Sequence, residues 1–273
     1  MDLSKTFCQE KGLISVLMGI YNCAATLPEA IDSVLKQTYS NWQLIMCDDG
    51  STDNTYEVAK QYEEAYPNKI IVLRNDRNMR LQYTLNRCLQ YAQGEYVARM
   101  DGDDVCSPER FEKEISFLNC NPDYALVSCQ MEMFDEDGTF RTVYYFEKPY
   151  SEQLLHGSQF CHAGCMMRTD VLRTLNGYDT SEKCERVEDY DLWVRLYAAG
   201  YKGYNIQEVL YSMRDDRNAF VRRSLRNRLN ESRIIFRAGL CFGRPAKGFF
   251  LCLVPIAKWF VPAKLYRIIH RKG

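Results

Sequence analysis

The fold is decided by residues 43–53, which read Gln-Leu-Ile-Met-Cys-Asp-Asp-Gly-Ser-Thr-Asp. Residues 43–47 have the length and apolar character of a buried strand. Asp48 and Asp49 follow at the end of that strand, and Gly50 begins a turn toward a predicted helix over residues 54–65. Two carboxylates at this point can accept hydrogen bonds from a ribose and a base, although a turn with an Asp or Thr helix cap is the structural alternative.

The same alternation continues on both sides of this stretch. The predicted elements are a strand over 13–20, a helix with Thr26 as N-cap and Pro28 in its first turn, a strand over 70–73, a helix over 83–92 and a strand over 96–100. Strands that alternate with helices predict an α/β fold with a mostly parallel sheet flanked by helices. In such sheets ligands bind beyond the carboxyl ends of the strands, so the residues just after each strand are the candidates for a site.

The alternation loosens after residue 104. We predict a helix over 108–118, a strand over 125–129 and a hairpin at the acidic turn of residues 135–138. A further helix over 187–199 ends at Gly200. Its first turn carries three carboxylates, those of Glu188, Asp189 and Asp191. Acids are favoured at any helix N-terminus, so their presence there does not by itself indicate a site.

Charge is distributed unevenly along the 273 residues, although the formal net charge is only -1. Residues 221–273 hold thirteen Lys or Arg and one acid, Glu231, whereas the first 220 residues are acidic. We therefore predict an N-terminal extension over 1–12, a catalytic domain over 13–215 and a basic, amphipathic helical extension over 216–273. A basic extension suits an anionic partner such as a membrane surface or nucleic acid, and a solvated basic helix is the alternative.

The twelve cysteines show no paired spacing, and no N-terminal signal peptide is recognisable. A disulfide framework is therefore not expected in a chain of this length, and a cytoplasmic, reducing location fits better. With only three histidines, the sequence also suggests no zinc site. We expect most of the cysteines to be small buried hydrophobic residues.

A second acidic motif follows the predicted strand at 96–100. Asp101, Gly102 and Asp103 form an Asp-x-Asp turn directly after Arg99 and Met100. Mg²⁺ and Mn²⁺ prefer oxygen ligands and often take only one or two protein carboxylates while phosphates and water complete the shell. Gly102 would let the backbone pass close to a bulky ligand. The alternative is an acidic surface turn.

Residues 188–193 supply a third acidic cluster, Glu-Asp-Tyr-Asp-Leu-Trp. A sugar hydroxyl is a weak nucleophile, so attack on an anomeric carbon needs a base that takes its proton. A carboxylate at a helix start could serve, and helix-dipole stabilisation is the alternative reading. The conjunction of three clusters at strand or helix ends, in the order nucleotide site, metal site and base, favours an enzyme.

Four motifs together resemble those of family 2 glycosyltransferases with the GT-A fold, a Rossmann-like architecture. They are residues 14–22 (Ile-Ser-Val-Leu-Met-Gly-Ile-Tyr-Asn), 48–53, 94–104 and 188–193. The resemblance covers about residues 13–212. It implies inverting transfer of a sugar from a nucleoside diphosphate sugar, UDP-linked, with Mg²⁺ or Mn²⁺. The Gln-x-x-Arg-Trp signature of processive synthases is absent from the sequence, so one sugar per encounter is expected.

The resemblance also implies roles for individual residues. Asp101 and Asp103 would hold the metal, and Asp189 would be the base, with Glu188 and Asp191 as alternatives. The donor would be bound by Tyr21, Asn22, Asp48, Asp49, Arg80, Arg99, Met100, Asp101, Gly102 and His162. Tyr21 and Asp49 would line the base and ribose, and Arg80 or Arg99 could touch phosphate. Arg80 departs from the family pattern, which commonly has a glycine near this point. A structural role is the alternative for His162, as for most lone histidines.

The C-terminal stretch 248–261 is apolar but is interrupted by Pro255 and Lys258, and Pro262 follows. A spanning helix needs about 20 apolar residues, so we expect peripheral contact with the cytoplasmic face of a membrane, or a helical cap on the catalytic domain. Membrane contact would suit a glycan or lipid-linked sugar acceptor in cell-surface polysaccharide or lipopolysaccharide assembly. No nucleic acid partner is expected.

Two other functions fit parts of the sequence. A nucleotidyltransferase would also use an α/β sheet and paired aspartates, but the Gly-rich, Lys-bearing phosphate loop expected near its N-terminus is absent. A non-catalytic protein that binds lipid or nucleic acid would have a degenerate transferase body, which the intact acidic motifs argue against.

Overall fold

The computed structural model describes residues 9–215 and 224–260. The chain divides into two compact units. A sheet unit contains residues 1–149, 160–178 and 201–214, and a helical unit contains residues 150–159, 179–200 and 215–273. The division differs from a single boundary at residue 215, because two internal segments group with the C-terminal helices.

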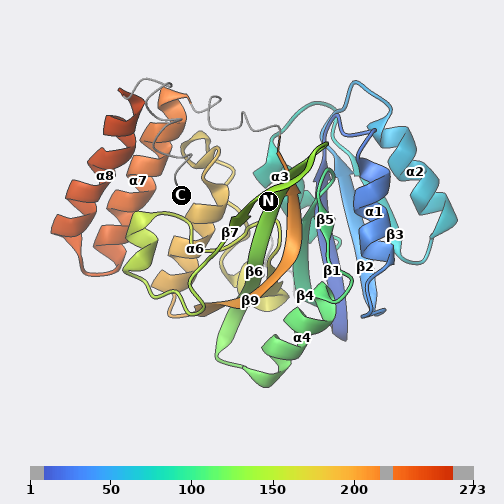
Figure 1. Cartoon of the computed structure of the whole chain (residues 1–273), viewed down its shortest axis with the longest axis horizontal. Coiled ribbons are helices and arrows are strands. Elements are labelled where there is room, and N and C mark those ends of the chain that lie inside the picture. The colour runs from blue at the N-terminus through green and yellow to red at the C-terminus, as the bar shows by residue number, and fades with distance from the viewer. Residues whose placement is uncertain (1–8, 216–223, 261–273) are drawn as a thin grey trace. The chain divides into compact units, whose positions relative to one another are not determined.

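The sheet unit is built on a nine-stranded mixed sheet (Figure 1). Four strands, β1 (Glu10–Ile20), β2 (Trp42–Asp48), β3 (Ile70–Arg74) and β4 (Gly94–Asp101), are parallel neighbours in the order β3-β2-β1-β4. The strand β8 (Met166–Arg168) is antiparallel to β4 and to β6 (Tyr124–Asp135), and β9 (Lys202–Arg214) is parallel to β6. Two short additions, β5 (Val105–Cys106) on β9 and β7 (Gly138–Val143) on β6, are antiparallel.

Register brings the first two acidic motifs to one edge of this sheet. Asp48 at the end of β2 pairs with Ile20 of β1, and Asp101 at the end of β4 pairs with Gly19. Because the three strands are parallel and end together, the loops that follow them are neighbours. This arrangement confirms the α/β fold and the parallel order predicted for this part of the chain.

The helices of the sheet unit in the described residues are α1 (Leu27–Leu35), α2 (Thr55–Ala65), α3 (Leu81–Leu89), α4 (Arg110–Cys120) and α5 (Thr169–Thr174). Helix α1 buries Leu27, Ile31 and Val34 in the main core, as its helical spacing predicts. Thr26 does precede α1, but its side chain makes no cap hydrogen bond. Its hydroxyl instead donates to the carbonyls of Cys23 and Gly102, which ties the start of α1 to the Asp-x-Asp turn.

The helical unit contains the 3₁₀ turns η1 (Gln153–His156) and η2 (Glu182–Cys184) and three helices, α6 (Glu188–Ala198), α7 (Leu225–Cys241) and α8 (Pro245–Trp259). Helices α7 and α8 approach so closely that a Cβ on Gly239 would lie 2.6 Å from the Cα of Gly248. Within the described residues no helix is long and apolar enough to cross a bilayer. Residues 216–223 and 261–273 of the predicted extension lie outside the described part.

Cysteines behave as the sequence predicts. Those in residues 9–215 and 224–260 are all free thiols, and most are buried. Cys106, Cys129 and Cys161 belong to the main hydrophobic core. Burial raises the pKa of the Cys161 thiol to about 12, so it stays protonated and packs as a small apolar group.

Candidate active site

The loop after β1 is joined to the loop after β2 by hydrogen bonds. Asn22 adopts a left-handed backbone conformation, with φ of 49°, which asparagine tolerates better than most residues. Its backbone N–H donates to the Ser51 hydroxyl at 3.0 Å, and its side-chain oxygen accepts from the Thr52 N–H at 2.9 Å. Tyr21, the neighbouring residue, is exposed at this edge of the sheet. Asn22 thus shapes the loop beside which the Tyr21 ring is presented.

Asp48 is a fully buried carboxylate whose partners are within the protein. It accepts hydrogen bonds from the backbone N–H of Ser51 and forms an ion pair with the Arg74 Nε at 3.2 Å. The Arg74 guanidinium lies over the ring of Tyr56, 4.4 Å from its centroid. The contacts of Asp48 therefore stabilise the turn after β2, and a donor contact by its side chain stays a prediction.

Asp49 holds the loop that precedes α3. One carboxylate oxygen accepts from the Asn75 amide at 2.7 Å and from the Met79 N–H at 2.8 Å, and the other accepts from the Arg80 N–H at 2.9 Å. Three donors on one buried carboxylate orient it strongly. Asp49 is therefore a positioning residue for the loop, and its predicted contact with a nucleotide is not tested by these bonds.

Arg80 occupies a backbone conformation that normally requires glycine. Its φ is 77° and its ψ is 158°, a region that L-residues with a Cβ rarely enter. The loop therefore keeps the shape that a glycine would allow, although the sequence lacks one. The hydrogen bond from the Arg80 N–H to Asp49 helps to hold this conformation.

The acidic turn after β4 gathers three carboxylates. Oxygen atoms of Asp101, Asp103 and Asp104 all lie within 4.8 Å of one another. Asp103 is exposed, whereas Asp104 is buried. Partial desolvation and the charge of Asp101 raise the pKa of Asp103, because both disfavour a further negative charge. Clustered carboxylate oxygens of this kind match the ligand preference of Mg²⁺ and Mn²⁺.

Arg99 is the nearest countercharge to this cluster. Its guanidinium is nearly fully buried and donates to both oxygens of Asp101, Nη1 at 2.8 Å and Nη2 at 2.5 Å. This two-point contact fixes the orientation of the Asp101 carboxylate. Asp103 is consequently the carboxylate of the pair that is most open to a cation from solvent.

Two residues predicted to contact the donor, Met100 and Gly102, are packed closely within the protein. The Met100 side chain is fully buried in the main core, because neighbouring residues of β4 point to opposite sides of the sheet. A Cβ on Gly102 would lie 2.9 Å from Ile20 Cγ2 and 3.0 Å from Cys23 Sγ. Packing of the protein itself is therefore sufficient to require glycine at 102, and the predicted donor contacts of Met100 and Gly102 stay predictions.

Tyr211 and Arg214 of β9 hold the acidic turn and were not identified from the sequence. The Tyr211 hydroxyl donates to Asp104 at 2.8 Å and accepts from the Asp101 N–H at 3.2 Å. The Arg214 backbone N–H donates to Asp104 at 2.8 Å, and its Nε donates to the Asp103 carbonyl at 3.0 Å. More than a hundred residues separate these partners along the chain, so no local pattern could have indicated the contact.

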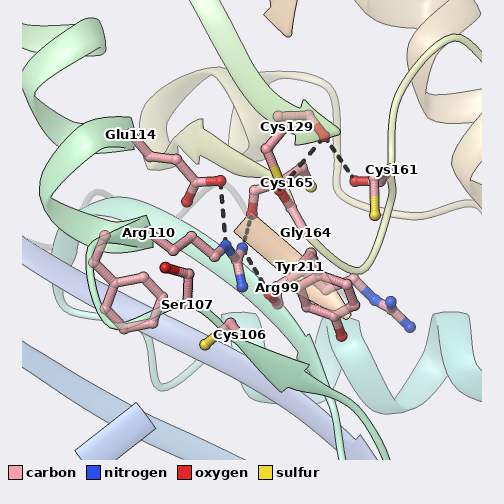
Figure 2. Close-up of polar contacts among 12 residues, drawn as sticks. Arg99, Cys106, Ser107, Arg110, Glu114, Cys129, Cys161, Gly164, Cys165 and Tyr211 are labelled. Atoms are coloured by element: carbon pink, nitrogen blue, oxygen red, sulfur yellow. Dashed lines mark hydrogen bonds and ion pairs between the residues drawn. The ribbon is translucent and has the colours of Figure 1, made fainter. Parts of the chain in front are cut away.

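Arg110 and Glu114 form a buried ion pair, and Arg110 also contacts Arg99 of β4 (Figure 2). Arg110 and Glu114 of α4 are fully buried, with the Arg110 Nε 3.2 Å from a Glu114 oxygen. Arg110 Nη2 also donates to the carbonyls of Arg99 and Cys165, which joins α4 to β4 and to the segment before β8. Burial raises the pKa of Glu114 to about 7, although the Arg110 charge opposes the shift. This pair supports the strand that leads into the Asp-x-Asp turn.

His162 lies near the same guanidinium as the acidic turn. Its Nε2 is 2.9 Å from the Tyr178 hydroxyl, and burial together with the charge of Arg99 lowers the pKa of the imidazole well below its ordinary value. The ring is therefore neutral at physiological pH. A neutral imidazole can exchange hydrogen bonds with a ligand without adding charge, so its predicted donor contact stays open.

The three carboxylates at the start of α6 belong to the helical unit and differ from one another. Asp191 is fully buried and is bound by the Arg195 Nε at 2.7 Å and by Arg237 of α7. Glu188 is also buried, and Asp189 is partly exposed. Asp191 therefore joins α6 to α7, which disfavours it as the base and leaves Asp189 and Glu188 as the better candidates.

Comparison with known proteins identifies the family. The model described as "Glycosyl transferase family 2" matches residues 15–175, which is more than half of the chain, and a second, "Glycosyl transferase family group 2", matches residues 96–262. The chain belongs to glycosyl transferase family 2. The match spans the acidic motifs at the edge of the sheet and confirms the resemblance seen in the sequence.

Two relatives cover most of this glycosyltransferase. EpsE of Bacillus subtilis (strain 168), which is named as a glycosyltransferase, is 41% identical over 95% of this chain and 93% of its own. WfgD of Escherichia coli is 30% identical over 67% of this chain and 69% of its own, and is named UDP-Glc:alpha-D-GlcNAc-diphosphoundecaprenol beta-1,3-glucosyltransferase.

Solved structures share the fold of this glycosyltransferase at low sequence identity. Staphylococcus aureus TarS, in complex with UDP-GlcNAc, superposes with a TM-score of 0.69 at 16% identity and covers 92% of this chain and 76% of its own. The Pyrobaculum calidifontis mannosyltransferase PcManGT, in complex with GDP-Man and Mn²⁺, superposes with a TM-score of 0.65 at 15% identity, over 95% of this chain and 79% of its own. Both neighbours confirm the GT-A fold.

Proposed function

We propose that this family 2 glycosyltransferase moves one sugar, with inversion, from a UDP-linked donor to a hydroxyl of a glycan or lipid-linked acceptor. The observation that carries the proposal is the juxtaposition of Asp48 and Asp101 in register at one edge of the sheet, with the exposed Asp103 beside them. Nucleotide ligands bind at this edge in open α/β sheets. The family match favours sugar transfer over a nucleotidyltransferase.

The donor assignment is supported by the neighbours and by local charge. TarS binds UDP-GlcNAc and PcManGT binds GDP-Man with Mn²⁺. In this chain Asp103 and Asp101, which lie in the same turn, would hold Mg²⁺ or Mn²⁺. The cation would supply positive charge to a departing diphosphate. Arg99 keeps the Asp101 carboxylate aimed, and Arg80 brings a second guanidinium to the loop before α3.

In the proposed reaction the acceptor hydroxyl oxygen bonds to the anomeric carbon while the bond from that carbon to the diphosphate oxygen breaks. The hydroxyl proton passes to a carboxylate base, for which Asp189 is our candidate. A single displacement of this kind inverts the anomeric configuration. Asp189 is preferred to Asp191 because the latter is buried between two arginines.

The acceptor class is proposed from the relatives. WfgD is named for transfer to a diphosphoundecaprenol-linked sugar, and TuaG of Bacillus subtilis, 28% identical over 75% of this chain, is named for teichuronic acid biosynthesis. An acceptor of that type carries a lipid, so we place the reaction at the cytoplasmic face of a membrane, in assembly of a cell-surface polysaccharide.

Calorimetric titration of UDP-Glc, UDP-GlcNAc and GDP-Man, with Mn²⁺ and with chelator, tests the donor site. We expect metal-dependent binding of a UDP sugar that Asp103→Asn abolishes. Asp123→Asn is the matched control, because Asp123 is an exposed aspartate that precedes β6, away from the carboxyl ends of the strands. Absence of binding by every nucleotide sugar, or equal binding by both variants, would contradict the proposed site.

A further inference from the structure

One side of helix α8 carries apolar side chains only and is exposed. Its residues recur at helical spacing and lie on one face of the helix: Ala246, Phe249, Phe250, Leu253, Val254 and Ala257, with Phe260 just beyond the end. Phe250 is 68% exposed and Phe260 77% exposed. We call these residues the apolar face of α8. Monomeric proteins rarely expose a contiguous patch of large apolar side chains without a binding role.

The opposite side of α8 is fixed against α7, so the apolar face cannot turn inward. Gly248 and Pro255 are the buried residues of α8, and Gly248 lies against Gly239 of α7. The Ser232 hydroxyl of α7 donates to the Cys252 carbonyl of α8. Any Cβ at residue 239 would meet the α8 backbone at 2.6 Å. The contact therefore fixes which side of α8 faces outward.

Positive charge lies at both ends of α8. Arg244 precedes α8, Lys258 lies in its last turn, and both are exposed. Lys247 forms an ion pair with Glu152 at 2.6 Å, so it contributes less net positive charge. In the sequence, residues 261–273 add Lys264, Arg267, Arg271 and Lys272 with no acid. A partner that suits both features is apolar where it meets this face and anionic near the ends of α8.

A membrane with anionic lipids meets both requirements. Nucleic acid is anionic but offers no apolar surface for a row of Phe, Leu and Val side chains. A second copy of the chain would bring two strongly basic segments together, and like charges across an interface are costly. Headgroups and acyl chains together supply negative charge beside an apolar layer. A helix of 15 residues spans about 22 Å, which is shorter than a hydrocarbon core of about 30 Å.

We propose that the apolar face of α8 docks in the interface of a membrane that contains anionic lipids, with α8 lying in the plane of that membrane. The proposal deepens the proposed function and rests on it for its biological purpose, because docking brings the enzyme to the surface where a lipid-linked acceptor lies. The docking itself requires neither donor nor acceptor, so the two proposals can fail separately.

Flotation of the full chain with large unilamellar vesicles tests the docking. We expect binding to vesicles that contain about one third phosphatidylglycerol and much weaker binding to pure phosphatidylcholine. Phe249→Ser combined with Phe250→Ser should lower the apparent affinity by about tenfold or more, because two exposed rings no longer enter the interface. Lys258→Gln should lower it about fivefold.

A matched control replaces two exposed aromatic residues of the sheet unit. Tyr144→Ser with Phe146→Ser removes side chains that are 76% and 64% exposed, and should leave vesicle binding unchanged. Titration of a UDP sugar into the same preparations separates this test from that of the donor site. Equal loss of binding in both double variants would overturn the proposal.

Two further outcomes would also overturn it. One is absence of binding to anionic vesicles. The other is a dimer, seen by sedimentation velocity, that the double serine variant of Phe249 and Phe250 converts to a monomer while vesicle binding is unaffected, because the apolar face would then belong to a second copy.

Discussion

The turn at residues 101–104 and the first turn of α6 each hold three carboxylates, but their countercharges differ. In the turn, Arg99 binds one carboxylate, Asp101, and Asp103 remains exposed. In α6, the central contact is a buried Asp191 between Arg195 and Arg237. The number of carboxylates in a stretch therefore does not distinguish a binding site from a structural anchor. The placement of arginines around them does.

The two regions also differ in how they could bind a cation. Asp179, Cys184 and Asp191 also place ligand atoms within 4.8 Å of one another. Two guanidiniums already neutralise Asp191, and the Cys184 thiol donates to Asp179 at 3.3 Å. A divalent cation there would have to displace arginines, whereas at Asp103 it would meet an exposed carboxylate. Of these two clusters in the described part of the chain, the turn after β4 is the better fit to a hard cation such as Mg²⁺.

The largest expected effect comes from Asp103→Asn. Loss of the exposed carboxylate should lower the transfer rate about a thousandfold, because the metal that stabilises the departing diphosphate would be lost. The free energy of unfolding should not fall, because burial and Asp101 raise the pKa of Asp103 and thus disfavour its charged form. Transfer assays and urea unfolding measure the two quantities. A large loss of stability would indicate a structural carboxylate.

Asp189→Asn tests whether Asp189, and not a neighbouring carboxylate, is the base. We expect the transfer rate to fall by about a hundredfold or more while donor binding and stability are retained, since this partly exposed side chain, as the proposed base, would act only on the acceptor proton. Stopped assays with a fixed donor concentration, together with donor titration, check this. Near-normal transfer would move the assignment to Glu188.

Glu114 is fully buried, and its single countercharge, Arg110, only partly offsets the effect of burial on its pKa. Its pKa is raised by burial to about 7, above the ordinary value of 4.5, so between these pH values the unfolded state releases a proton that the folded state keeps. Stability should therefore fall as pH rises from about 4.5 to 7, by up to about 3 kcal/mol.

Urea unfolding between pH 5 and pH 8 measures this dependence. Replacement of the pair by Arg110→Met with Glu114→Leu should flatten it, and stability near neutral pH should change little or increase. An identical pH dependence in the wild type and the double variant would show that Glu114 is not the group responsible.

Asp191→Asn should affect stability where Asp189→Asn affects rate. The substitution removes the charge between Arg195 and Arg237, and should lower the free energy of unfolding by about 2 kcal/mol, since both arginines keep some solvent contact. Residual activity at low temperature should remain high. Thermal unfolding of Asp191→Asn and Asp189→Asn, measured together, tests this difference. Loss of stability without loss of transfer rate in both variants would contradict it.

The smallest effect is expected at Arg80. Arg80→Gly should raise the free energy of unfolding by about 1 kcal/mol, because glycine enters the region at φ of 77° without a Cβ clash. Donor affinity should fall as the guanidinium is lost. Arg80→Ala is the control, since it also removes the guanidinium but keeps the strain. Equal stability of the two variants would show that Asp49 holds the loop without strain.

The sequence by itself determined the order of elements in the first hundred residues and the positions of the acidic motifs. Apolar runs at 13–20 and 43–47 and helical spacing at 54–65 are local patterns, and the structure has strands and helices there with ends shifted by a few residues. The strands β8 and β9 were not predicted. The first has three residues, and the second, which begins Lys-Gly-Tyr-Asn, lacks a clear alternation of apolar and polar residues.

Only the tertiary structure decided which carboxylates are anchors. The partners of Asp104 and Asp191 come from Tyr211 and Arg237, far along the chain, and the contacts of Asp49 depend on the shape of the loop before α3. The positions of acidic residues can be read from the local sequence. The free energy of burying a carboxylate, however, depends on the dipoles and countercharges around it in space. That is why three similar acidic motifs could be found from the sequence, while their roles required the fold.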